Sequence, residues 1–127
     1  MNVVIDTNVL ISGLINPDDT PAKIINLLIN ERITIFYDNR ILQEYIGVLH
    51  REKFGFTVEL IDPLLDFIKN EGQFVTADPI NFSDENDKIF LEVAESASVD
   101  YLITGNTKHF PKNNIIVTPK EFIDKLC

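Results

Sequence analysis

Short apolar runs alternate with longer amphipathic stretches along the whole chain. Five runs rich in β-branched and aromatic residues predict strands, at residues 3–5, 33–37, 73–76, 101–104 and 115–117. Apolar residues spaced three and four apart predict helices at 8–15, 20–30, 39–49, within 58–71, at 84–97 and after Pro119. Strands that alternate with helices are typical of an α/β fold, in which helices cover both faces of a central, mostly parallel sheet of about five strands.

Polar residues and prolines indicate where several of these helices begin. Thr20 is suited to cap a helix whose first residue is Pro21, and Asp38 to cap the helix after the second strand. The segment from Thr118 to Glu121 is a capping box for a terminal helix. Pro63 leaves the start of the helix within 58–71 open, because proline is comfortable only in a first helical turn.

The first apolar run ends in a group of polar residues. Residues 3–5 form an uninterrupted β-branched run, which suits a strand buried on both faces. Asp6 ends this run, and Thr7 and Asn8 follow as helix-capping types. Since functional groups in open α/β sheets gather beyond the carboxyl ends of the strands, we expect Asp6 at such an edge.

Length and composition favour a single domain over residues 1–127. The chain carries a net charge of −9, which argues against binding nucleic acid by broad neutralisation of phosphates. A site that handles phosphates through a metal ion stays open, since the cation supplies the positive charge. The one cysteine, Cys127, has no partner for an internal disulfide, and no window is apolar enough to span a membrane. We expect a cytoplasmic protein without a membrane segment.

Two further carboxylates fall beside buried helix faces. Glu44 lies three residues after Ile41 and four before Val48, and Asp87 lies three before Phe90. The other charged residues of the helix predicted at 84–97, among them Glu92, are expected in solvent. A carboxylate at a core boundary is costly unless it is paired or binds a metal.

If Asp6, Glu44 and Asp87 converge, their oxygens suit Mg²⁺ or Mn²⁺, which would activate water for attack at phosphorus. Simpler explanations stay open for each: Asp6 as a helix cap, Glu44 as a surface residue, and Asp87 as an acid favoured by the helix dipole after an Asp84 cap.

Four motifs in order resemble those of the PIN-domain family, and within it the VapC-like toxins of toxin–antitoxin systems. The resemblance covers essentially the whole chain. The motifs are the strand-ending aspartate in residues 4–10, the acidic Glu44 inside a helix, the segment 84–90, and the strand 101–104 that ends in Thr-Gly before Asn106.

This resemblance implies a PIN-like three-layer α/β/α fold and a Mg²⁺- or Mn²⁺-dependent endoribonuclease. Asp6, Glu44 and Asp87 would take the catalytic and metal-binding places, with Thr104, Asp84, Asn8 and Asn106 as accessory residues. It also implies RNA as substrate, an antitoxin protein as partner and a homodimer in many members. Asn106 departs from the family pattern, in which many active members carry a fourth aspartate, and a second metal site is therefore in question.

Some cations are placed to touch a substrate. Lys108 and His109 follow the fourth strand, and Arg40 opens the helix that carries Glu44. Arg51 and Lys53 follow the other end of that helix and are expected further away. Phe110 either stacks on a base or lies in the core. Neither histidine, His50 nor His109, has an evident carboxylate partner, so no histidine general base is expected.

Two other functions stay open. A binding module that keeps the PIN-like fold with weak or no catalysis is motivated by Asn106 and the acidity. A phosphotransfer domain, either an aspartate phosphatase or a receiver, ranks below it, because position 8 is Asn8 where the phosphatase pattern wants an aspartate.

Overall fold

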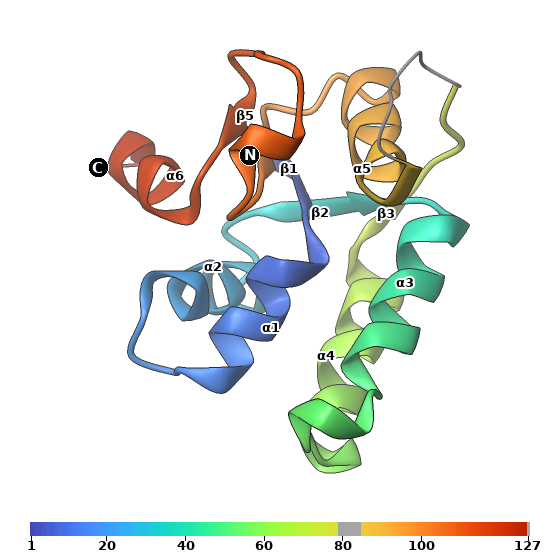
Figure 1. The fold of residues 1–127 in the computed structure, drawn as a ribbon, viewed down its shortest axis with the longest axis vertical. Coiled ribbons are helices and arrows are strands. Elements are labelled where there is room, and N and C mark those ends of the chain that lie inside the picture. The colour runs from blue at the N-terminus through green and yellow to red at the C-terminus, as the bar shows by residue number, and fades with distance from the viewer. Residues whose placement is uncertain (79–84, 127) are drawn as a thin grey trace.

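The computed structural model describes residues 1–78 and 85–126, and within them five strands form one parallel sheet (Figure 1). The strand order is β3-β2-β1-β4-β5, and every neighbouring pair is parallel. The bounds of the strands are β1 (Asn2–Ile5), β2 (Thr34–Tyr37), β3 (Gln73–Phe74), β4 (Tyr101–Ile103) and β5 (Ile116–Val117). The expected α/β class and parallel sheet are confirmed.

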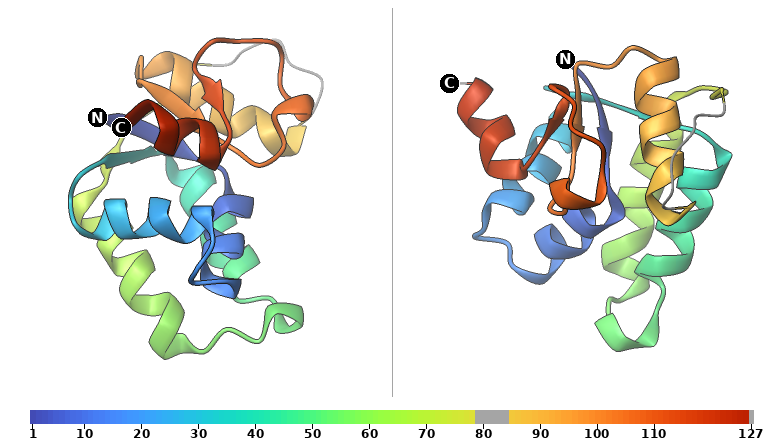
Figure 2. Two further views of the ribbon diagram at one scale, coloured as in Figure 1. Left: turned by 90° about the vertical axis from the view of Figure 1, so that its left-hand side faces the viewer. Right: turned by 45° about the horizontal axis from the view of Figure 1, so that its top comes forward.

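Helices cover both faces of the sheet. Figure 2 shows α5 across the strands from α1 and α2. α5 packs on β1, β2 and β4, while α6 packs on α2, β4 and β5. The helices are α1 (Thr7–Ile15), α2 (Thr20–Ile29), α3 (Asn39–Leu49), α4 (Val58–Glu71), α5 (Glu85–Ser96) and α6 (Pro119–Leu126), with short 3₁₀ turns η1 (Glu52–Phe54) and η2 (Thr107–His109).

The first strand lies at the centre of the sheet. Val3 is paired with Ile35 of β2 on one side and with Tyr101 of β4 on the other. Val3, Val4 and Ile5 are fully buried, because strands flank β1 on both edges and helices cover both of its faces. The carboxyl end of this strand therefore opens at the middle of the sheet edge.

Aspartates cap the first three helices. Asp6 caps α1 by accepting from the backbone N–H of Asn8, and Asp38 caps α3 by accepting from that of Ile41. Asp19, not Thr20, caps α2, so the expected cap was wrong by one residue. An aspartate here is as good a cap as a threonine, and it begins the helix one residue earlier.

Helix α4 contains a proline in its interior. The helix begins at Val58, which settles the start that the sequence left open, and it continues through Pro63. Proline removes the N–H that would bond to the carbonyl of Glu59. Both residues are exposed, so the carbonyl that lacks this donor belongs to a residue at the surface of the helix.

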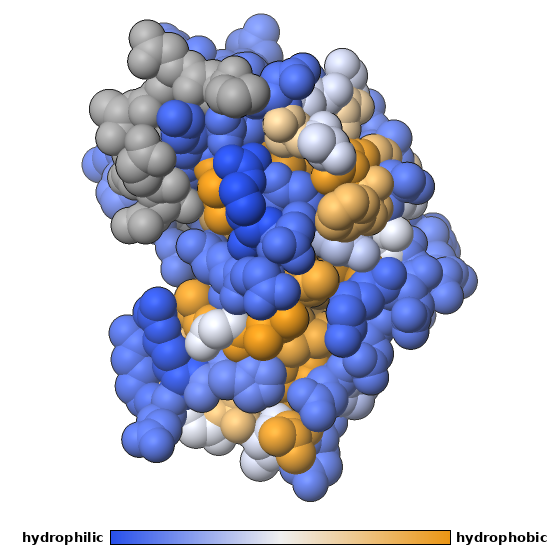
Figure 3. Space-filling model, turned by 90° about the vertical axis from the view of Figure 1, so that its right-hand side faces the viewer, coloured by the Kyte–Doolittle hydropathy of each residue, from blue (hydrophilic) through white to orange (hydrophobic). Residues whose placement is uncertain are grey.

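The terminal helix begins with the expected capping box. The backbone N–H of Thr118 donates to Glu121 Oε1 at 2.9 Å, and the N–H of Glu121 donates to Thr118 Oγ1 at 3.1 Å. In the described ranges, no helix is both long and apolar enough to cross a membrane. The face in Figure 3 is mostly hydrophilic, with an apolar strip in a hollow across its middle.

Candidate functional site

Three carboxylates line one cavity of about 300 Å³ at the carboxyl edge of the sheet. Asp6 follows β1, Glu44 comes from α3, and Asp87 lies in the first turn of α5. We call this hollow the carboxylate cavity. The residues that line it are Asp6, Thr7, Asn8, Ile11, Glu44, Val48, Arg51, Lys53, Phe54 and Asp87.

Asp6 is almost completely buried, with 3% of its surface exposed. Its Oδ2 accepts a hydrogen bond from Thr104 Oγ1 at 2.7 Å, and its Oδ1 accepts from the backbone N–H of Asn8 at 3.4 Å. Burial raises the pKa of Asp6 above its ordinary value, and these hydrogen bonds oppose that rise only in part. A bound cation would offset the cost of the buried negative charge.

Glu44 is held at the same cavity by the residue that follows Asp6. Thr7 Oγ1 donates to Glu44 Oε2 at 2.5 Å. Burial raises the pKa of Glu44, the hydrogen bond from Thr7 lowers it, the charge of Asp6 raises it, and Arg51 lowers it. Glu44 and Asp6 are thus close enough to disfavour each other's ionisation.

Tyr45 fixes the position of α3 against the end of β1. Its hydroxyl donates to the backbone carbonyl of Ile5, and its fully buried ring lies 6.3 Å from the ring of Phe90 on α5. Burial raises the pKa of Tyr45 well above its ordinary value, so the hydroxyl keeps its proton and remains a donor. The neighbouring Glu44 is thereby brought to the carboxyl edge of β1.

A histidine accompanies the third carboxylate. His109 Nδ1 lies 3.5 Å from Asp87 Oδ2, and His50 Nε2 lies 3.8 Å from Asp62 Oδ1. The expectation that neither histidine has a carboxylate partner was therefore wrong. Both partners come from a different secondary-structure element, which spacing along one helix does not reveal.

Arg51 and Lys53 also line the carboxylate cavity, together with Phe54. From the sequence we expected these two cations to lie further from the site, and that expectation was wrong. After α3 the chain enters η1 and turns at Gly55, whose φ of 65° is left-handed and is easily adopted by glycine. This loop carries the three side chains back to the cavity.

Arg40 lies outside the carboxylate cavity. Its guanidinium donates to Asp38 Oδ2 at 2.8 Å and to Glu92 Oε1 at 2.6 Å. Glu92 is only 2% exposed, so the expectation that it faces solvent was wrong. It is buried because α5 is enclosed by the sheet on one side and α3 on another, and the cation of Arg40 offsets its charge.

The other candidate residues lie in different places. Thr104 is fully buried against Asp6, and its Oγ1 accepts from the backbone N–H of Asn106 at 3.0 Å. Lys108 lines a separate hollow beside Phe110. Of the two positions expected for Phe110, stacking on a base or packing in the core, the structure shows the core. Asp84 lies outside the described residues.

The donor set suits a hard divalent cation. Asp6 and Glu44 offer carboxylate oxygens at one cavity, and Mg²⁺ usually binds through one or two carboxylates while it keeps several waters. No group of three His, Cys, Asp or Glu side chains in the described part of the chain is arranged to hold a metal ion. The charge of Asp6 acts on Glu44, so these two carboxylates lie close enough to fit one ion, and Asp87 lines the same cavity.

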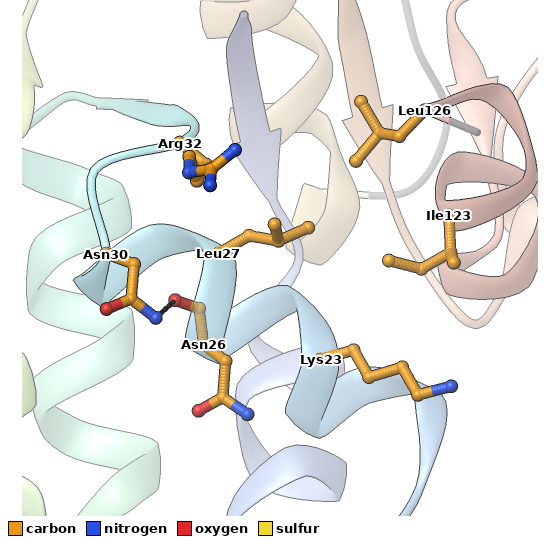
Figure 4. A pocket seen from close by; sticks show the side chains of 7 residues that line it. All are labelled: Lys23, Asn26, Leu27, Asn30, Arg32, Ile123 and Leu126. Atoms are coloured by element: carbon orange, nitrogen blue, oxygen red, sulfur yellow. Dashed lines mark hydrogen bonds between the residues drawn. The ribbon is translucent and has the colours of Figure 1, made fainter.

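A larger hollow lies elsewhere on the molecule. It measures about 630 Å³ and lies between α2 and α6 (Figure 4). None of the described residues that line it is a carboxylate, so these residues do not offer the metal chemistry of the carboxylate cavity. Its lining residues are Lys23, Asn26, Leu27, Asn30, Arg32, Ile123 and Leu126.

Comparisons with known proteins agree with this fold. A family model described as a PIN domain matches residues 2–108. The chain is 35% identical over 145 aligned positions to the uncharacterized protein MJ1680 of Methanocaldococcus jannaschii, with 98% of this chain and 91% of that protein covered. A solved structure of VapBC2 from Rickettsia felis, bound to a DNA fragment from its promoter, is similar with a TM-score of 0.58 and 20% identity. The match covers 93% of this chain and 98% of that one.

Proposed function

Because the chain belongs to the PIN-domain family, we propose that it is a metal-dependent endoribonuclease that hydrolyses RNA phosphodiesters. The observation that carries this proposal is the convergence of Asp6, Glu44 and Asp87 on one cavity, at the edge where α/β sheets place their functional groups. Two cations, Arg51 and Lys53, line the same cavity and supply contacts for the phosphates of a substrate.

Asp6 and Glu44 would hold Mg²⁺ or Mn²⁺. When bound, such an ion polarises a water for attack at phosphorus and stabilises the charge that develops on the phosphate oxygens. Thr104 and Thr7 orient the two carboxylates through their hydroxyls, so both enter the reaction in a fixed geometry. Asp87 lines the same cavity and would take part there, with His109 Nδ1 3.5 Å from its Oδ2.

The cations act on the substrate. Arg51 and Lys53 line the same cavity as the carboxylates, so their side chains would contact the phosphates of an RNA strand bound there. Their charges oppose the repulsion between RNA and a chain with a net charge of −9. Binding is therefore local to the cavity and does not depend on a broad basic surface.

We further propose that the nuclease is the toxin of a toxin–antitoxin pair, acts in the cytoplasm and is blocked by an antitoxin protein. The likeness of the fold to VapBC2 supports this partner. Co-expression with the product of the adjacent gene should give a co-purifying complex without RNase activity. A homodimer of the free protein is part of the same proposal, and its mass in solution tests it.

The departure at Asn106 favours a second candidate, a PIN-like module that binds RNA or protein with little or no cleavage. An amide at this position removes a negative charge that a second metal ion would need. RNA binding without cleavage in added Mn²⁺ would favour this candidate over the nuclease.

The decisive experiment measures cleavage of single-stranded and structured RNAs by partner-free protein in Mg²⁺, Mn²⁺ or EDTA. Asp6→Asn should lower the rate at least about a hundredfold, because it removes a ligand charge at the reacting centre. Asp66→Asn is the matched control, since it makes the same change on an exposed part of α4. Mn²⁺ should also raise the unfolding temperature of the wild type and not that of Asp6→Asn.

Metal-independent cleavage, or equal rates for Asp6→Asn and Asp66→Asn, would contradict the assignment. The absence of cleavage by folded wild-type protein in every condition would leave the binding module as the better candidate.

A further inference from the structure

A second hollow adjoins the carboxylate cavity. It measures about 360 Å³ and shares three lining residues with that cavity, Asn8, Ile11 and Phe54. It reaches from α1 to the turn after β4 and the start of α6, along the same edge of the sheet. We call it the side pocket. Its lining residues are Asn8, Val9, Ile11, Ser12, Pro21, Phe54, Gly105, Asn106 and Pro119.

The two hollows differ in charge. Three carboxylates and two cations line the carboxylate cavity, whereas the residues that line the side pocket carry no charge. Apolar side chains form most of its wall, among them Val9 and Phe54. A hollow of this size and composition suits a neutral, flat organic group with a few polar atoms, and not a phosphate or a charged peptide.

Polar groups in the side pocket are available to a ligand. In the described part of the chain, no hydrogen bond engages the side chains of Asn8, Ser12 or Asn106. These three side chains together offer both donors and acceptors. The edge of a nucleobase presents the same mixture.

Phe54 stands between the two hollows. Its ring stacks on that of Phe56 at 5.6 Å with an angle of 14°, and Lys53 Nζ lies 5.1 Å from its centroid. An aromatic wall beside cations is the combination with which proteins hold unpaired bases along a single strand. The phosphate of a nucleotide and its base are only a sugar apart, so neighbouring hollows can hold one each.

We propose that the side pocket holds one unpaired base of a single-stranded RNA, next to a phosphodiester in the carboxylate cavity, and that Asn106 recognises the edge of that base. This inference rests on the proposed nuclease function and adds a base-binding pocket to it. It also gives a role to the asparagine that departs from the family pattern. An amide both donates and accepts hydrogen bonds, whereas an ionised aspartate only accepts.

The first test fills the side pocket. Gly105 lines it, and a Cβ there would meet no heavy atom within 4 Å, so the first carbon of the side chain in Gly105→Leu fits without a clash while the variant adds bulk at the pocket. Gly47→Leu is the matched control, because Gly47 on α3 has the same open space and lines neither hollow. The probe is a labelled single-stranded RNA of about eight nucleotides, within the usual site size. Fluorescence anisotropy in EDTA measures its binding without cleavage.

Gly105→Leu should weaken binding of the single strand about tenfold and leave binding of a duplex of the same length unchanged, since a duplex offers no free base. Gly47→Leu should match the wild type for both probes. Wild-type affinity of Gly105→Leu for the single strand, with its fold confirmed by circular dichroism, would overturn the proposal.

The second test changes the recognition of the base. Asn106→Asp and Asn106→Ala are compared with the wild type on single strands of A, C, G and U. Both variants should change the order of preference among the four. An unchanged order in both would overturn the role of Asn106, and it would do so even if Gly105→Leu failed to fold.

These outcomes are distinguishable from failure of the proposed function. Wild-type protein that cleaves RNA in Mn²⁺, while Gly105→Leu binds and cleaves equally well, contradicts the side pocket alone. Wild-type protein that neither binds nor cleaves RNA contradicts both.

Discussion

Thr104 donates its hydroxyl to Asp6 at 2.7 Å, across 98 residues of sequence. The same oxygen accepts the backbone N–H of Asn106, so the threonine joins the end of β1 to the turn after β4. Because Thr104 is fully buried, its hydroxyl has no freedom to exchange these partners for water. The orientation of Asp6 thus depends on the neighbouring strand as well as on its own.

Thr104→Val should lower cleavage about ten- to a hundredfold, because it leaves Asp6 without its orienting donor while the shape of the side chain is kept. The loss should appear in kcat and in the concentration of Mn²⁺ required. Thr104→Ser retains the hydroxyl and should restore most of the activity. Equal activity of the valine and serine variants would show that the hydroxyl has no part in the reaction.

The paired carboxylates should make stability fall as pH rises. Burial raises the pKa of Asp6 above its ordinary 3.8 and that of Glu44 above its ordinary 4.5. The folded state therefore holds these protons more tightly than the unfolded chain. Their contribution to stability is present below the unfolded values and is lost as pH rises through the folded ones.

Asp6→Asn and Glu44→Gln should consequently raise the unfolding temperature at neutral pH in EDTA, and much less at a pH below 3.8. The exposed Asp66→Asn should show no such difference. Thermal unfolding followed by circular dichroism at both pH values measures this. A lower unfolding temperature for both site variants at neutral pH would contradict the electrostatic account of the cavity.

Arg51 should act on RNA through its charge. Arg51→Gln should weaken RNA binding for every sequence and reduce the slope of log affinity against log salt by about one, as expected when one phosphate contact is lost. Arg32→Gln, in the hollow between α2 and α6, is the matched control and should leave both quantities unchanged. An unchanged salt slope for Arg51→Gln would place the phosphate path elsewhere.

Arg40 should act on stability instead. Arg40→Gln removes the cation that bonds to the buried Glu92, at a cost of about 1–3 kcal/mol in the free energy of unfolding. Lys69→Gln breaks an exposed pair with Asp66 and should cost no more than about 1 kcal/mol. Urea titration measures both, and RNA affinity should be unaffected. A stable Arg40→Gln variant with weakened RNA binding would support a substrate contact.

The sequence predicted the parts of the site that lie on regular elements. Asp6 is located by the end of a β-branched run, and Glu44 by its place beside the apolar stripe of α3. Both positions follow from a periodicity that the structure keeps. The alternation of strands and helices likewise predicted the parallel sheet, because parallel strands need crossover connections.

The parts that were missed depend on contacts between elements. Glu92 is buried because the sheet and α3 both pack against α5. The assumption that α5 buries only one apolar face was therefore wrong. Arg51 and Lys53 line the cavity although they follow α3, because the chain passes directly from α3 into the short turn η1. A glycine between two phenylalanines, Phe54 and Phe56, is a sequence signal that would have suggested a sharp turn.

The order of the strands determines when the carboxylate cavity can form during synthesis. β1 is made first, yet its neighbour β4 ends only at Ile103, and the chain emerges from the ribosome in sequence order. Until then Asp6 lacks Thr104, whose hydroxyl donates to its Oδ2. The hydrogen bond that orients Asp6 therefore forms only after the chain has been made through Thr104, so any activity that depends on this bond begins only once β4 is complete.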